Sequence, residues 1–114
     1  MTIADLIAQL RSAPDTIEFD QVMATITENY DYTPVRFTNG AVVNEAGTNE
    51  GSCKIFAFAQ LNALSEMETL ALFGKYYRDD VMGNPAGDDH GNIRNFIIDG
   101  WLGIKFDDVA LTLK

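Results

Sequence analysis

Two residues of this sequence could act together as a nucleophile and a base, because the chain holds one cysteine, Cys53, and one histidine, His90. Ser52 is a residue type that starts helices, and a thiol in the first turn of a helix ionises more easily. The imidazole of His90 could then take the thiol proton, with Asp89 or Asn92 orienting the ring. This set is typical of a cysteine hydrolase or acyltransferase, which is our enzymatic alternative.

The same two residues also have a structural interpretation. Cys53 is followed by Ile55 and Phe56, and a cysteine in such company commonly packs as a small hydrophobic side chain. His90 stands just before a predicted helix, where an imidazole can cap the helix or hydrogen-bond to a carbonyl. The sequence favours this structural interpretation, so whether the chain is an enzyme stays open at this stage.

An acidic region around His90 offers ligands for a cation. Carboxylates and an imidazole suit hard or borderline divalent ions. The spacing of the acidic residues, however, matches no known cation-binding loop. From the sequence we therefore favour a solvated acidic surface and assign no metal site and no cofactor. The residues concerned are Asp79, Asp80, Asp88, Asp89 and His90.

The loop 44–52 places glycines and exposed amides before a helix, which is in general terms an anion-binding arrangement. It lacks the glycine and lysine spacing of a phosphate-binding loop, and Lys54 lies beyond it, so a structural turn is favoured. Trp101 stands between Gly100 and Gly103 and is expected first as a core residue and only second as a platform for a ligand. Our candidate binding residues are Asn44, Asn49, Ser52, Arg94 and Trp101.

The leading functional hypothesis is a small non-enzymatic domain that binds a protein or a small ligand. Its expected surface lies near Cys53, the loop 44–52 and the loop 88–92, because the distinctive polar residues gather in these loops. No complete catalytic set is evident beside them.

Composition limits the classes of partner and the cellular compartment that we expect for this chain. The chain has 114 residues, a net charge of -9 and a hydrophobic content of 46%, which is ample for a packed core. The negative charge opposes binding to nucleic acid or to an anionic membrane surface. A single cysteine forbids an internal disulfide, and Asp5 precedes any basic residue, unlike in a secretory signal. We therefore expect a soluble cytoplasmic protein.

One stretch near 53–64 should organise the fold. A helix over these residues has almost no polar side, and a helix that is apolar all round is a buried one. We expect it to run through the middle of the molecule. Its apolar residues are Ile55, Phe56, Ala57, Phe58, Ala59, Leu61, Ala63 and Leu64.

The remaining patterns predict one mainly helical α+β domain over residues 1–114, with about five helices. Asn39-Gly40 predicts a small β-hairpin near 35–43. Ser65 with Glu68 three residues later predicts a capping box that starts a new helix. Further expected elements are a helix from Thr2 to Ser12, a second with Asp15 and Glu18 at its start and Tyr30 near its end, a helix continuing from 65 to Val81, a helix from Ile93 to Gly100, a short strand near 104–106 and an undecided tail from Asp107.

Four blocks of the sequence between Asn39 and Phe106 resemble the HopJ family, and the resemblance covers nearly the whole chain. They are N-G-A-V-V-N-E-A-G-T-N-E-G-S-C-K-I-F-A-F-A from Asn39, L-F-G-K-Y-Y-R from Leu72, D-H-G-N-I-R-N-F from Asp89 and G-W-L-G-I-K-F from Gly100. The resemblance implies a single HopJ-like domain and names no catalytic residue. It also implies a third functional possibility, an effector that a type III system secretes into a host cell.

Overall fold

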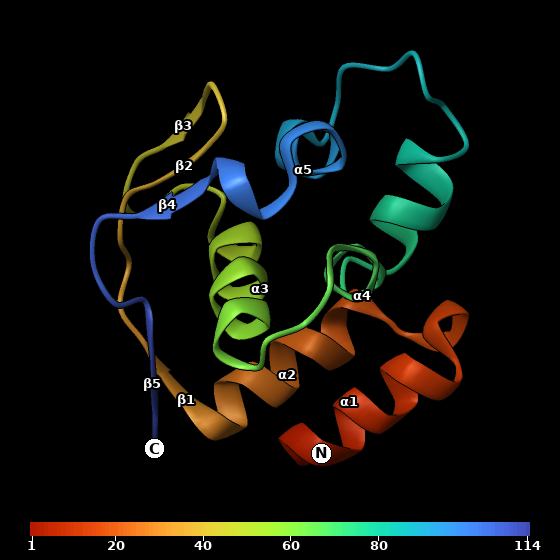
Figure 1. Ribbon diagram of the computed structural model, residues 1–114. Helices are drawn as coiled ribbons and strands as arrows, with labels where there is room; N and C mark the ends of the chain where they lie inside the picture. The colour runs from red at the N-terminus through yellow and green to blue at the C-terminus, as the bar shows by residue number, and fades with distance from the viewer.

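The buried helix expected in the middle of the chain is the centre of the fold. In the computed structural model, which describes residues 1–114, helix α3 (Glu50–Leu61) is enclosed by the other elements (Figure 1). Ile55, Phe56 and Phe58 have no exposed surface. Because successive residues of a helix point about 100° apart, burial of these three encloses α3 on several sides. The expectation of a central apolar helix is confirmed. The helix lies a few residues earlier than the predicted span 53–64, so that Leu61 is 58% exposed at its end and Ala63 and Leu64 follow it.

The mainly helical α+β class is also confirmed. Figure 1 shows the strands on one side of α3, α2 at its C-terminal end with α1 packed against α2, and α5 beside its N-terminal end. No helix of the chain is both long and apolar enough to cross a lipid bilayer. In chain order the elements are α1 (Ile3–Ser12), a 3-10 turn (Pro14–Thr16), α2 (Phe19–Asn29), β1 (Tyr30–Tyr32), β2 (Phe37–Asn39), β3 (Val42–Asn44), α3, α4 (Glu66–Ala71), a π-helix (Tyr76–Val81), α5 (Gly91–Asp99), a 3-10 turn (Gly100–Gly103), β4 (Ile104–Phe106) and β5 (Leu111–Leu113).

Two small antiparallel sheets cover the strand side of α3. The hairpin turns at Asn39-Gly40, as expected, and pairs β2 with β3. β4 pairs with the other edge of β2, which places Phe106 opposite Phe37 and confirms the short strand near 104–106. The undecided tail forms β5, which pairs with β1 in a second sheet. The two sheets therefore bring the C-terminal strands back against residues 30–39.

Side chains close the starts of α1, α2 and α4. Thr2 Oγ1 accepts a hydrogen bond from the Asp5 amide at 3.0 Å. The predicted capping box of α4 is confirmed, because Ser65 and Glu68 exchange hydrogen bonds at 2.9 and 3.1 Å. The start of α2 was placed too early: Asp15 lies in the preceding 3-10 turn, and Glu18 is the residue before the helix.

The helix expected to continue from 65 to Val81 is broken, and this part of the prediction was wrong. Gly74 has a φ of +61°, and a Cβ there would lie 2.9 Å from the Phe19 amide nitrogen. After the break the backbone forms a π-helix, in which the Met82 amide donates to the Tyr77 carbonyl five residues earlier. Such wide turns are rare and often lie at functional sites.

Candidate functional site

The first turns of α3 and α5 face the same pocket, which has a volume of about 220 Å³. Figure 1 shows α5 beside the end of α3 at which the chain arrives from the hairpin. The loops 44–52 and 88–92 therefore meet at one place. The helix starts contribute Asn49, Gly51, Ser52, His90, Gly91 and Asn92, and the apolar part of the lining comes from Phe19, Phe73, Tyr76 and Ile93.

Neither helix start at this pocket has a side-chain cap. Asn49 precedes α3 and His90 precedes α5, both in the left-handed conformation with φ of 49° and 51°. Ser52 does not cap α3 as expected, because the helix begins three residues earlier than a Ser52 cap would require. The first amides of a helix have no partner inside it and carry a partial positive charge. Two such positive ends therefore converge on the pocket.

A network of four asparagines joins the two helix starts beside the pocket; Asn39, Asn44 and Asn92 are buried and Asn49 is exposed. Asn39 Nδ2 donates to the Asn92 backbone oxygen at 2.8 Å. Asn44 and Asn92 exchange side-chain hydrogen bonds at 3.1 and 2.8 Å, and Asn49 Nδ2 donates to Asn44 Oδ1 at 2.7 Å. These amides join β2, β3, the start of α3 and α5. No buried side-chain polar atom of the chain lacks a partner, so the network is fully satisfied.

Cys53 lies inside α3 and not at its free end. Its amide already donates to the Asn49 carbonyl at 3.0 Å, and its side chain is 1% exposed. Burial raises the pKa of the thiol, while hydrogen bonding from the Tyr32 side chain and the Val35 backbone lowers it in part. Burial also raises the pKa of Tyr32, with further contributions from Cys53 and Glu50. The thiol therefore faces the β1 side of α3 and does not line the pocket.

His90 takes different partners. Its Nε2 lies 2.9 Å from Asp80 Oδ2 and 3.9 Å from Asp89 Oδ2, and its ring packs on Tyr76 with centroids 5.2 Å apart. No hydrogen bond joins His90 to Cys53, and the residue that orients the imidazole is Asp80 on the π-helix. The pairing of Cys53 with His90 stays a prediction without support from the observed contacts.

Arg94 braces the loop before α5. Its guanidinium donates to the Asn84 carbonyl at 3.0 Å, to the Asp89 carbonyl at 2.6 Å and to Asp89 Oδ1. The hydrogen bond from Arg94 holds the pKa of Asp89 below its usual range. Asn92, the other expected partner of the imidazole, belongs to the asparagine network. Arg94 and Asn92 therefore shape the loop that carries His90.

Known proteins match this chain over nearly its whole length. A scan against protein-family models matches residues 3–111 to the family described as HopJ type III effector protein. The chain belongs to the HopJ family. A solved structure titled "Crystal structure of unknown function protein VPA0580" is 53% identical and superposes with a TM-score of 0.98, covering 100% of this chain and 95% of that chain. A search of the curated proteins gave no match.

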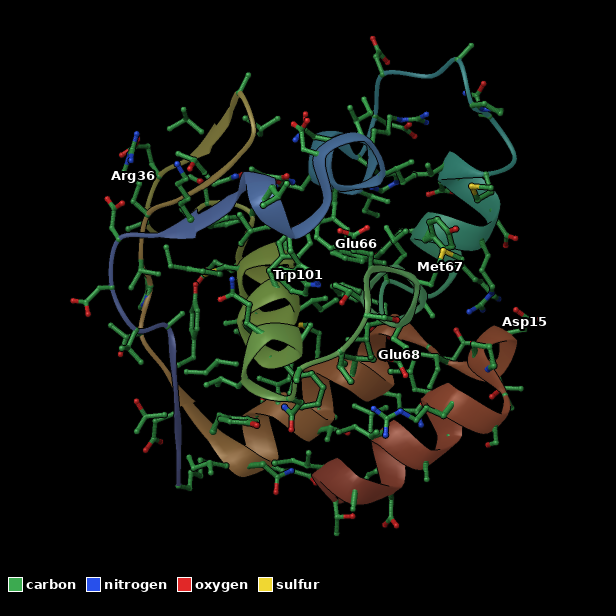
Figure 2. The ribbon with its side chains drawn as sticks, in the orientation of Figure 1. Asp15, Arg36, Glu66, Met67, Glu68 and Trp101 are labelled. Atoms are coloured by element: carbon green, nitrogen blue, oxygen red, sulfur yellow. The ribbon has the colours of Figure 1, made fainter.

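In this HopJ chain Trp101 lies away from the pocket. Its Nε1 donates to the Leu64 carbonyl at 3.2 Å, and its ring meets Phe56 and Phe96 edge-on. Figure 2 shows Trp101 over α3 with Glu66 nearby, and Glu66 Oε2 accepts from the Trp101 amide at 3.1 Å. The core interpretation of Trp101 therefore agrees with its contacts.

The aromatic wall of the HopJ pocket was missed in the sequence. Neither Phe19 nor Tyr76 was among the residues predicted to bind a ligand. Their rings lie 5.0 Å apart, edge to face, on neighbouring elements. The signal that joins them is the break at Gly74, which allows the π-helix to turn back toward the start of α2.

Proposed function

We propose that this chain is a small non-enzymatic binding domain whose pocket, between the starts of α3 and α5, takes a small ligand with an anionic group. The observation that carries the proposal is that α3 and α5, the two α-helices whose first amides no side chain caps, both begin at this pocket. Free amides at a helix start bind anions because they donate hydrogen bonds at the positive end of the helix dipole. Two such ends reinforce one another at a shared site.

The rest of the lining indicates the remainder of the ligand. Phe19, Phe73 and Tyr76 offer an apolar, aromatic wall opposite the amides, and Ser52 supplies a hydroxyl group. Ligand pockets commonly combine an apolar lining with a few placed polar groups that fix orientation. The preferred ligand is therefore a compact carboxylate or phosphate that carries an apolar or ring-shaped part.

The proposal gives Cys53 no chemical role. A buried thiol with a raised pKa holds little thiolate at neutral pH, and the thiolate is the nucleophilic form. The hydrolase or acyltransferase that uses Cys53 and His90 stays an alternative prediction. We expect no binding to nucleic acid or to membranes, because the net charge of -9 opposes both.

Inorganic phosphate is the simplest probe of the anion site. We would titrate it into ¹⁵N-labelled protein in chelator-treated buffer and follow the backbone amides by NMR. The expected result is saturable shifts centred on Gly51, Ser52 and Gly91. The variant Ser52→Asp should abolish these shifts, because its carboxylate occupies the same amides and repels the anion, while it adds helix stability of about 0.5 kcal/mol.

Two further variants distinguish the effect of a charge at the pocket from the effect of the protein's net charge on phosphate binding. Ser52→Asn makes a neutral change at the same position and should retain phosphate binding. Ser12→Asp adds the same charge at the exposed end of α1 and should also retain it. Shifts that never saturate, that spread evenly over the surface, or that survive Ser52→Asp would remove the proposal.

We further infer residence in the cytoplasm, with delivery into a host cell as the alternative. The description of the family as a type III effector supports that alternative. A translocation assay decides between them, using the full chain fused to a reporter enzyme that is active only inside host cells. Reporter signal that requires an intact type III system would favour the effector function over cytoplasmic residence.

A further inference from the structure

Three side chains with metal-ligating atoms lie close together next to the pocket, and one of them, His90, lines it. Asp80 comes from the π-helix, and Asp89 and His90 come from the loop just before α5. One ligand atom of each lies within 4.8 Å of the other two. No other group of three such residues in the chain comes as close, although Asp79 and Asp88 are their neighbours in sequence.

The geometry points to a divalent transition-metal site formed by Asp80, Asp89 and His90, with Zn²⁺ or Mn²⁺ as the fitting ions. His90 Nε2 is 2.9 Å from Asp80 Oδ2 and 3.9 Å from Asp89 Oδ2. Ligand atoms at about 2.0–2.2 Å from one ion lie roughly 3–3.5 Å apart. The two His90 distances fall on either side of that range, and the two carboxylates lie within 4.8 Å of one another, so these side chains need only local movement to bind one ion. One imidazole with two carboxylates favours such ions over Ca²⁺ and Mg²⁺, which prefer oxygen ligands alone.

Neighbouring residues already hold two of the three ligands in place. Arg94 binds Asp89 through Oδ1 and the backbone carbonyl, which leaves Oδ2 turned toward His90. Tyr76 packs on the imidazole and restricts its rotation. Outer partners of this kind orient metal ligands and raise affinity.

Metal binding requires Nε2 of His90 to offer its lone pair. A neutral ring with its proton on Nε2 moves that proton to Nδ1 and releases none, whereas an imidazolium releases one proton to solvent. The ion then replaces the direct contact between Nε2 and Asp80 Oδ2. No redox step or further reactant is needed.

An observation independent of the triad also indicates a ligand at this place. The pocket of about 220 Å³ opens beside His90 and carries the uncapped amides of α3 and α5. Three protein ligands leave coordination positions free, as in metal sites that accept a further ligand. An ion held by Asp80, Asp89 and His90 could therefore share an anion with those amides, although its own binding does not depend on the proposed anion.

The test is a calorimetric titration of the chelator-treated full chain with ZnCl₂ in buffer free of phosphate. We expect a single saturable site per chain, and at least about tenfold weaker binding in each of Asp80→Asn, Asp89→Asn and His90→Gln. CaCl₂ and MgCl₂ should bind at least about tenfold more weakly than ZnCl₂. Circular dichroism of each variant confirms that it is folded, and Asp80→Asn carries the test if His90→Gln is not.

The matched controls are Asp79→Asn and Asp88→Asn, which remove the same charge next to the triad. Both should bind Zn²⁺ within about twofold of the natural chain, because neither side chain belongs to the group. Equal losses in control and triad variants, equal affinity for Ca²⁺, or no saturable binding would each overturn the site and leave an exposed ion pair between His90 and Asp80. The Zn²⁺ titration contains no phosphate and the phosphate titration contains no metal, so each proposal can fail without affecting the test of the other.

Discussion

The starts of the α-helices divide into two groups that are built in opposite ways. α1 and α4 begin with hydroxyl caps from Thr2 and Ser65, and the Gln21 side chain accepts from the backbone before α2. α3 and α5 begin after left-handed residues, and no side chain covers their amides. Caps stabilise helices by about 1 kcal/mol each. The two helices that begin at the pocket therefore lack the stabilisation that a cap would add, and such departures from local rules are expected at functional sites.

At the pocket, the buried asparagine side chains hold the starts of α3 and α5 in place of caps. Removing one of these side chains should therefore lower the free energy of unfolding more than any other change considered. Asn92→Ala leaves the side chains of Asn39 and Asn44 short of partners in the core. We expect the free energy of unfolding to fall by about 3 kcal/mol, measured by urea denaturation. The exposed Asn84→Ala serves as control and should stay within about 0.5 kcal/mol. A loss below about 1 kcal/mol for Asn92→Ala would mean that the network contributes little.

The two serines at helix starts should respond differently to the same substitution. Ser65→Ala removes a formed cap and should lower the free energy of unfolding by about 1 kcal/mol. Ser52→Ala removes a hydroxyl group that makes no hydrogen bond and should change it by less than about 0.3 kcal/mol. Thermal and urea unfolding of both variants measure the difference. Equal losses would erase the distinction between the two groups of helix starts.

The left-handed residue before α5 offers a test of backbone strain. His90→Gly and His90→Ala both remove the imidazole and its contact with Asp80, but only glycine adopts a φ of 51° without a steric cost. We expect the glycine variant to be more stable than the alanine variant by about 1 kcal/mol. Identical stabilities would show that the start of α5 relaxes freely and is not held by its surroundings.

The smallest effect concerns the buried side of α3 and its dependence on pH. Because burial raises the pKa of Cys53 in the folded state, the native thiol stays protonated where the unfolded thiol ionises, above about pH 8.5. Its contribution to stability is complete below that pH and is lost as the pH rises toward the folded pKa. The free energy of unfolding should therefore decline between pH 8 and 9.5, and less steeply in Cys53→Ala.

Iodoacetamide labelling of Cys53 gives a second readout for the same residue. We expect labelling at pH 8 to proceed only as fast as the protein unfolds. Rapid labelling of the folded chain, with an apparent pKa below about 8.5, would instead favour the enzymatic alternative.

Local signals in the sequence predicted the elements that local interactions decide. Ser65 and Glu68 are three residues apart and form their capping box within one turn. Asn39-Gly40 forms its hairpin because Gly40 takes a φ of +58°. The run from Ile55 to Ala59 is buried as its composition requires. In each case the deciding contacts lie within a few residues of one another or follow from burial alone.

The features that were missed depend on distant residues. Asn92 forms hydrogen bonds with Asn39 and Asn44, which lie 53 and 48 residues earlier in the sequence, and no local pattern predicts such contacts. Ser52 and Asn49 are equally good caps by residue type, yet α3 begins just after Asn49, whose side chain donates to Asn44. Gly74 lies within the span that was predicted as one helix from 65 to Val81. Its close approach to Phe19 becomes evident only in the folded chain.

The direction in which the Asp80 side chain points depends on the number of residues in the π-helical turn. Its hydrogen bond from Met82 to Tyr77 spans five residues where an α-helix spans four. Deleting one residue before Asp80 would let the segment wind as an ordinary α-helix and swing this carboxylate by about 100° away from His90. Insertions and deletions, more than substitutions, would then determine whether relatives of this chain retain the juxtaposition of the two side chains.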